Sequence, residues 1–182
     1  MEEKARKNNT TITVYTDGGC RNTGVQKSGH VNSTDKAAWA FRIDWFANAN
    51  ERAINGRYAD CGGKYGATNN QMELTALVKA LEELIDLEQD EDIPINSATD
   101  EIRFFLDSQY VINGVKNIKS WKAKGWRNSQ GPVKNLELWK KIDTLLPHFP
   151  HCSFNWVKGH ADNEGNNWVD QELNRYMDVE MK

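Results

Sequence analysis

Four acidic residues stand where a carboxylate is costly unless it has a partner. Asp17 and Asp107 each come at the carboxyl end of a predicted strand. Glu73 and Asp170 each lie on the apolar face of a predicted helix, among residues that must be buried. A buried carboxylate without a partner loses its hydration, so several that converge need cations to stay ionised. Hard oxygen ligands from four separate segments suit Mg²⁺ or Mn²⁺ rather than zinc.

Metal ions held in this way favour chemistry at phosphorus. Two divalent cations about 4 Å apart are a common device for in-line displacement at a phosphodiester. Taken singly, the acids have ordinary explanations: Asp17 and Asp107 could cap turns, and Glu73 could be a first-turn acid that the helix dipole favours. The four together are harder to explain in that way, and they predict a metal-dependent site.

The elements that must position these acids follow from hydrophobic periodicity and from turn residues. Alternating residues predict strands, and Gly18-Gly19 is expected to end the first of them. A capping residue, Thr68 or Asn69, begins a long amphipathic helix that ends near Leu87. A short helix is expected after Asp107-Ser108. The remaining expected elements are strands over 11–17, 38–45, 52–61, 102–106 and 153–157 and helices over 134–145 and 166–177.

This order of elements predicts an α/β fold. Three sequential strands with short connections form an antiparallel meander, and a right-handed crossover then places the fourth strand beside the first, parallel to it. The expected result is a five-stranded mixed sheet in the order 3-2-1-4-5 with helices on both faces. Asp17 and Asp107 would then meet at one carboxyl edge, where open α/β sheets bind ligands.

Composition sets broad limits on the class of protein. The chain has 182 residues, about one domain, with 23 basic and 26 acidic residues. A net charge of −3 argues at first against a nucleic-acid partner. The charge is unevenly distributed, however, because residues 116–141 contain eight basic residues and one acid, Glu137. This basic stretch, interleaved with tryptophans, is typical of a surface that binds phosphates.

The sequence also indicates where the chain would work. Its longest unbroken apolar run has five residues, 37–41, which is too short for a membrane span, and residues 1–10 are polar. The cysteines are odd in number and widely spaced, at Cys20, Cys61 and Cys152, so neither a disulfide framework nor a zinc site is expected. A cytoplasmic protein without a membrane partner follows as the prediction.

Four segments in this order resemble ribonuclease H type 1 (RNase HI). They are YTDGGC (15–20), ATNNQMEL (67–74), LDSQYV (106–111) and WVKGHA (156–161), with Asp170 ten residues after the histidine. The resemblance covers roughly residues 11–178. It implies an RNase H-like fold, with a flexible tail at 1–10, a catalytic domain over 11–182 and a basic protrusion at about 116–135.

The same resemblance implies a reaction and its cofactor. The expected activity is endonucleolytic hydrolysis of the RNA strand in an RNA/DNA hybrid, leaving 5′-phosphate and 3′-hydroxyl ends. Two Mg²⁺ ions would be bound per site with substrate, and Mn²⁺ would substitute for them. Asp17, Glu73, Asp107 and Asp170 match the metal-binding acids of the family. His160 matches its histidine for proton transfer or product release.

Contacts to the substrate are also implied by the resemblance. The protein must sense the ribose 2′-hydroxyl, and Asn and Gln suit this because they both donate and accept hydrogen bonds. A second pocket would hold a phosphate of the DNA strand, and the protrusion would follow the backbone with lysines and tryptophans. The matching residues are Asn22, Asn69, Asn70 and Gln109 for the minor groove, Thr68 and Asn135 for the phosphate pocket, and Trp121, Lys122, Lys124 and Trp126 for the protrusion, with Trp139 on the helix after it.

Some features depart from the family pattern or leave alternatives open. The turn before Asn22 is one residue short, and the loop over 25–36 is long. An integrase- or resolvase-like nuclease acting on DNA, a non-catalytic hybrid-binding module and a nuclease domain of a reverse transcriptase are the alternatives. The histidine loop argues against the first, and the four acids argue against the second. A monomeric, stand-alone enzyme without an N-terminal hybrid-binding domain is expected.

Overall fold

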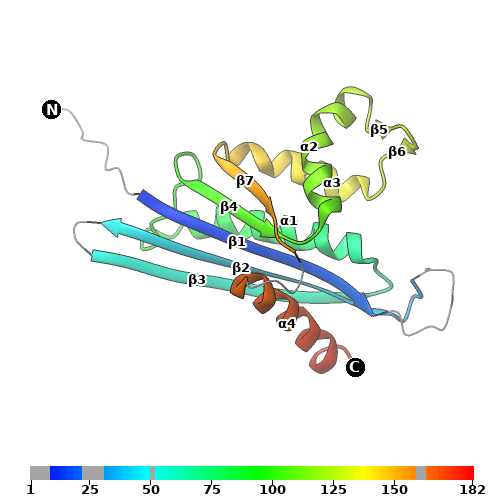
Figure 1. The fold of residues 1–182 in the computed structure, drawn as a ribbon, viewed down its shortest axis with the longest axis horizontal. Helices are drawn as coiled ribbons and strands as arrows, with labels where there is room; N and C mark the ends of the chain where they lie inside the picture. The colour runs from blue at the N-terminus through cyan, green and yellow to red at the C-terminus, as the bar shows by residue number, and fades with distance from the viewer. Residues whose placement is uncertain (1–8, 22–30, 50–51, 159–162) are drawn as a thin grey trace.

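The structure, a computed structural model, describes residues 9–21, 31–49, 52–158 and 163–182. Its centre is a mixed sheet of five strands in the order β3-β2-β1-β4-β7 (Figure 1). β1 pairs antiparallel with β2 and parallel with β4, and β4 pairs parallel with β7. The strands are β1 (Asn9–Arg21), β2 (Lys36–Ala49), β3 (Arg52–Tyr65), β4 (Glu101–Leu106) and β7 (Cys152–Trp156).

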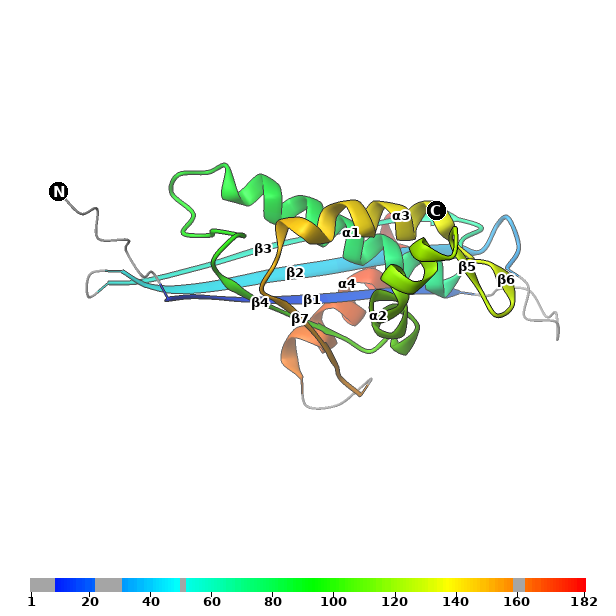
Figure 2. The same cartoon turned by 90° about the horizontal axis from the view of Figure 1, so that it is seen from above.

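Helices cover both faces of this sheet. Figure 2 shows α1 and α3 on one face and α4 on the other, where it packs on β1 and β2. α2 contacts α1 and β7. The helices are α1 (Asn69–Glu88), α2 (Gln109–Ala123), α3 (Leu136–Leu145) and α4 (Glu164–Val179), with a short 3₁₀ helix, η1 (Leu146–His148).

The predicted fold is confirmed, with a small hairpin and the short helix η1 added. The fifth strand of the sheet is β7 rather than the fifth strand of the chain, because a small hairpin, β5 (Arg127–Asn128) and β6 (Gly131–Pro132), lies within the basic protrusion. The hairpin has two residues in each strand, too few to show the alternation that marks a strand in a sequence. Gly131, the first residue of β6, has a φ of 116°, which favours glycine.

The expected end of the first strand is wrong. β1 passes through Gly18 and Gly19 and continues to Arg21. A Cβ atom on Gly18 would lie 2.2 Å from the backbone nitrogen of Glu73, so this glycine permits the close approach of α1 to the strand. Glycine after a strand pattern predicts a turn, but Gly18 marks a close contact between two backbones.

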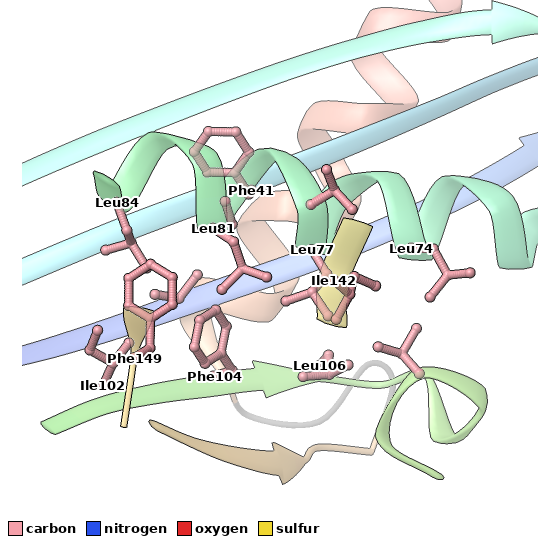
Figure 3. Close-up of a cluster of buried hydrophobic side chains, with 14 of the residues drawn as sticks. Phe41, Leu74, Leu77, Leu81, Leu84, Ile102, Phe104, Leu106, Ile142 and Phe149 are labelled. Carbon is pink, nitrogen blue, oxygen red and sulfur yellow. The ribbon is translucent and has the colours of Figure 1, made fainter. Parts of the chain in front are cut away.

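Helix α1 connects the core to the site. Thr68 caps it, accepting a hydrogen bond from the Gln71 N–H, while the Gln71 side chain accepts one from the Thr68 N–H, which completes a capping box. Figure 3 shows its apolar side chains packing toward β4 and α3. The labelled residues of this cluster are Phe41, Leu74, Leu77, Leu81, Leu84, Ile102, Phe104, Leu106, Ile142 and Phe149.

A second, smaller core lies under α4. Val169, Leu173 and Met177 pack on the small side chains of Ala38 and Ala40 in β2. α4 begins two residues before its predicted start, because the Asn163 side chain accepts a hydrogen bond from the Asn166 N–H and caps the first turn. No helix among the described residues has both the length and the hydropathy that crossing a membrane requires.

Candidate active site

Three carboxylates from three elements converge at one edge of the sheet. An oxygen of Asp17, one of Glu73 and one of Asp107 all lie within 4.8 Å of one another. The register explains the first and the third, because Tyr15 and Phe105 are paired in the parallel strands β1 and β4. Each aspartate stands two residues beyond that pair, so the two emerge side by side.

Glu73 reaches the same point because α1 packs directly on β1. The backbone of Met72 and Glu73 lies against Gly18, where no side chain intervenes. Glu73 is buried, and its Oε2 atom has no hydrogen-bond partner among the described residues. A buried carboxylate oxygen without a partner is costly, and a cation bound between the three acids would satisfy it. The oxygen donor set fits Mg²⁺ or Mn²⁺.

The electrostatics agree with this interpretation. Burial, and then the charge of Asp107, raise the pKa of Asp17 to about 7, although the Gly18 N–H donates to its Oδ1 at 2.7 Å. Burial and the neighbouring Asp17 raise the pKa of Glu73 well above its usual range. Carboxylates that repel one another in a dry environment bind protons or cations readily. The cluster is therefore built to hold a positive charge.

Asp170 faces the same cavity from the other side of the sheet. It comes from α4 and, with Asp17, Glu73 and Asp107, lines a cavity of about 350 Å³. Its charge contributes to the raised pKa of Asp17. Asp170 is not one of the three acids within 4.8 Å of one another. All four acids predicted from the sequence thus border one cavity, with three of them in close contact.

Without a metal ion, the protein is expected to lose stability as the pH rises from about 4 to about 7. The pKa of Asp17 is 3.8 in the unfolded chain and about 7 in the folded one, so unfolding releases a proton in this range. The complete loss is on the order of 4 kcal/mol and is reached about one pH unit above 7. Urea denaturation with a chelator, at pH 5 and pH 8, measures it.

Asp17→Asn is the control for this pH dependence. Because the amide carries no charge, the variant is expected to be more stable than the wild type at pH 8 without metal, and saturating Mg²⁺ is expected to stabilise the wild type more than the variant. An identical pH dependence in both proteins would contradict a raised pKa at Asp17.

The residues predicted to contact the minor groove lie at helix starts, and Asn69 also lines the cavity of the four acids. Asn69, Asn70 and Gln109 are all exposed, at the first turns of α1 and α2. Asn69 also has a structural role, since its Oδ1 accepts a hydrogen bond of 2.6 Å from the Cys20 N–H. This bond ties the end of β1 to the start of α1. Asn22 lies outside the described residues.

The two residues of the predicted phosphate pocket differ in their surroundings. Thr68 is exposed and caps α1. Asn135 precedes α3 in the left-handed conformation, with φ 56°, and its Nδ2 donates to the Tyr110 hydroxyl at 3.0 Å. Asparagine tolerates this conformation better than most residues. The side chain of Asn135 is thereby oriented by α2.

One residue predicted to contact the substrate, Trp139 in α3 after the protrusion, cannot do so. Trp139 is fully buried, with its ring 5.3 Å from that of Trp121, and its Nε1 donates to the Tyr110 hydroxyl at 3.3 Å. The prediction of a substrate contact at Trp139 is therefore wrong, and its role is to support the protrusion. Trp121 and Trp126 are half-buried.

The lysines of the protrusion are exposed, but the stretch is less purely basic than its sequence indicates. Lys122 forms an ion pair of 2.8 Å with Asp143, which follows the basic stretch in α3. Lys124 is exposed and lines a surface cavity with Trp121 and Arg127. His160, the predicted catalytic histidine, and residues 25–30 of the long loop lie outside the described residues.

Two further residues of the site were missed by the sequence reasoning. The Trp156 indole Nε1 donates to the backbone carbonyl of Asp107 at 3.0 Å and so holds the main chain of a cluster acid. Asn174 lies beside Asp170 and lines the same cavity. Trp156 is the first residue of the WVKGHA segment, and Asn174 follows Asp170 by about one helical turn. Spacing could thus have indicated both, but not what they bind.

The family model described as RNase H matches residues 9–177. The ribonuclease H of Ruthia magnifica subsp. Calyptogena magnifica is 38% identical over 170 residues, which cover 92% of this chain and 95% of that protein. The ribonuclease H of Paracidovorax citrulli is 34% identical over 170 residues, covering 92% and 94%. Both similarities extend over nearly the whole of each chain.

Solved structures show the same fold at lower identity. LC9-RNase H1, a type 1 RNase H with the type 2 active-site motif, superposes with a TM-score of 0.71 at 20% identity, over 91% of this chain and 71% of that one. The foamy viral protease-reverse transcriptase in complex with RNA/DNA hybrid superposes with a TM-score of 0.67 at 16% identity, over 92% of this chain and 20% of that one. These similarities concern the fold.

Proposed function

Because this chain belongs to the RNase H family, we propose that it hydrolyses the RNA strand of RNA/DNA hybrids at its carboxylate cluster and leaves 5′-phosphate and 3′-hydroxyl ends. It is a ribonuclease H, a metal-dependent endonuclease that cleaves phosphodiester bonds. The observation that carries the proposal is the convergence of Asp17, Glu73 and Asp107 within 4.8 Å, in a chain whose family match extends over residues 9–177.

The proposed cofactor is a pair of Mg²⁺ ions, for which Mn²⁺ would substitute. Asp17, Glu73 and Asp107 would hold them together with Asp170, which borders the same cavity. Bound cations would lower the pKa of an attacking water and stabilise the leaving 3′ oxygen. The partnerless Oε2 of Glu73 and the raised pKa of Asp17 support this assignment.

The protein's own residues hold the acids in place before substrate arrives. The Trp156 indole fixes the main chain at Asp107, and the Gly18 N–H donates to Asp17. The first bond fixes the backbone from which the Asp107 side chain projects, and the second holds the Asp17 carboxylate, which reduces the reorganisation needed in the reaction. His160 is proposed to assist proton transfer or product release.

The substrate would lie across the helix starts that border the cluster. Asn70 and Gln109 are exposed there and can both donate to and accept from a ribose 2′-hydroxyl, the group that distinguishes RNA from DNA. Asn22 and Asn69 are proposed to join them. Thr68 and Asn135 would hold a phosphate of the DNA strand. Trp121, Lys122, Lys124 and Trp126 would follow the backbone.

A cleavage assay on four matched duplexes and strands tests the activity. With Mg²⁺, a uniformly labelled RNA/DNA hybrid is expected to be cut, with little action on single-stranded RNA, double-stranded RNA or DNA. End analysis of the products should give 5′-phosphate and 3′-hydroxyl groups. Equal cleavage of double-stranded DNA would contradict the proposal and favour the DNA nuclease instead.

Replacing Lys122 and Lys124 together by alanine is expected to raise KM for the hybrid and to weaken its dependence on salt. Each phosphate contact that is lost should reduce the slope of log affinity against log salt by about 1. The ion pair of Lys122 with Asp143 makes Lys124 the larger contributor. Steady-state kinetics at several salt concentrations measure both effects.

The control for this prediction is Lys79→Ala, which removes an exposed lysine that is also paired, with Glu82, on α1. An unchanged salt slope in the double variant would show that the protrusion is only a solvated surface. The single catalytic domain over 11–182, the monomeric state and the cytoplasmic location stay predictions from the sequence.

A further inference from the structure

Helix α4 carries three polar residues, Asp170, Asn174 and Asp178, at a spacing of four. Residues at this spacing lie on one side of a helix. In the structure this side faces the end of β1, where Arg21 is the last residue of the strand. Arg21, Asn174 and Asp170 also line the cavity of the carboxylate cluster. Asp178, Arg21, Asn174 and Asp170 therefore form a row that leads from the surface to the proposed metal site.

The four side chains form one continuous chain of hydrogen bonds. Asn174 Nδ2 donates to Asp170 Oδ1 at 3.2 Å and to the Asp170 backbone carbonyl at 2.8 Å. Arg21 Nη2 donates to Asn174 Oδ1 at 3.1 Å and to Asp178 Oδ2 at 3.1 Å. Arg21 Nη1 donates to the other oxygen of Asp178. Each link has a defined donor and acceptor.

The chemistry of arginine decides how the amide of Asn174 is oriented. A guanidinium group only donates hydrogen bonds, so the amide oxygen must face Arg21. The amide NH₂ group is then turned toward Asp170, where a carboxylate can only accept. Asp178 holds the guanidinium in this position, and the hydrogen bonds from Arg21 lower the pKa of Asp178 and keep it ionised.

We propose that Asn174 is a positioning residue for Asp170 and that Arg21 acts on Asp170 through it. This inference rests on the proposed function, in which Asp170 helps to hold the metal ions. One oxygen of Asp170 accepts from Asn174, which leaves the other for a cation. Carboxylate ligands commonly depend on such outer partners, whose loss costs about 10- to 100-fold in metal affinity or activity. Asp170 lies outside the group of three acids within 4.8 Å of one another, so its position depends most on a partner such as Asn174.

Asn174→Ala tests the first link of this chain. Calorimetric titration of the protein alone with Mn²⁺ is expected to show about tenfold weaker binding. With hybrid and Mg²⁺, kcat should fall while KM for the hybrid stays unchanged. Asn117→Ala is the matched control, because its Nδ2 donates to the backbone carbonyl of Asn113 at 2.8 Å, also four residues earlier. The control should bind Mn²⁺ as the wild type does.

Arg21→Gln tests the second link, with Arg175→Gln as its control. Arg175 is paired with Glu172 on the same helix, so its loss removes a guanidinium without touching the row. Arg21→Gln should weaken Mn²⁺ binding less than Asn174→Ala does, and the double variant should bind no more weakly than Asn174→Ala alone. Additive losses would overturn the action of Arg21 through Asn174.

Asp170→Asn separates this inference from the proposed function. If Asp170→Asn weakens Mn²⁺ binding but Asn174→Ala does not, the positioning role is wrong and the metal site stands. If Asp170→Asn leaves Mn²⁺ binding unchanged, Asp170 is not a ligand, and both the assignment and the inference fail. Thermal unfolding without metal checks that each variant is folded.

Discussion

Asp17→Asn and Asp107→Asn are each expected to reduce kcat for hybrid cleavage by more than about 100-fold. Losing a residue that only supports a metal ligand already reduces metal affinity or activity by about 10- to 100-fold, and these two acids are proposed ligands themselves. Each substitution removes one of three carboxylates that lie within 4.8 Å of one another. Hybrid binding should stay measurable, since the proposed backbone contacts come from the protrusion. Single-turnover cleavage and a filter-binding assay measure the two effects separately.

Unfolding is not expected to cause the loss in Asp17→Asn. Neutralising Asp17 relieves repulsion among buried acids, so the metal-free variant is expected to be at least as stable as the wild type above pH 7. Asp92→Asn, which makes the same change at an exposed position, is the control for activity. Undiminished cleavage by both site variants would disprove the assignment of the metal site.

Gly18→Ala is expected to destabilise the protein by about 3 kcal/mol and to abolish metal binding, because it forces α1 away from β1. The new Cβ would lie 2.2 Å from both the Met72 carbonyl carbon and the Glu73 nitrogen, and 2.7 Å from the Met72 oxygen. All three are backbone atoms, so no side-chain rotation can relieve the overlap. Any movement of the helix carries Glu73 away from Asp17 and Asp107.

Gly19→Ala is the matched control for stability. Its Cβ would lie 3.4 Å from Leu173 Cδ1, the end of a flexible side chain, so the free energy of unfolding should change little. Urea denaturation measures both variants, and Mn²⁺ titration measures the site in Gly18→Ala. A Gly18→Ala protein as stable as Gly19→Ala would contradict the close contact of α1 with β1.

The order of the main elements could be predicted because their patterns are long. The apolar face of α1 recurs over twenty residues, and β4 alternates between buried and more exposed residues over its six. The same regularity predicted that Asp17 and Asp107 meet at one edge of the sheet and that Glu73 lies on a buried face, although β1 continues past Asp17 to Arg21. A carboxylate on an apolar helix face can be recognised as a candidate functional residue from the sequence alone, because burying a carboxylate without a partner is costly.

Other features depend on tertiary contacts between segments that are distant in the sequence. From the sequence alone, Gly18 is equally consistent with a turn and with a close contact between β1 and α1. Only the position of the Glu73 backbone decides between the two. Trp139 in sequence is one tryptophan among several in a basic stretch. Its burial against Trp121 depends on how α3 packs on α2. The hairpin β5–β6 is too short to leave a pattern.

The amino-acid sequence by itself determined the fold class, the edge of the sheet at which the acids meet and the identity of those acids, because periodicity and burial are properties of single segments. The tertiary structure alone decided which oxygens lie within 4.8 Å, which tryptophan is covered and which partners hold each acid. Arg21 and Asn174 are 153 residues apart in the chain, and only the packing of α4 on β1 brings them together. Distances between residues that are far apart in the sequence are set by the packing of the whole core, so they cannot be predicted from a local sequence pattern.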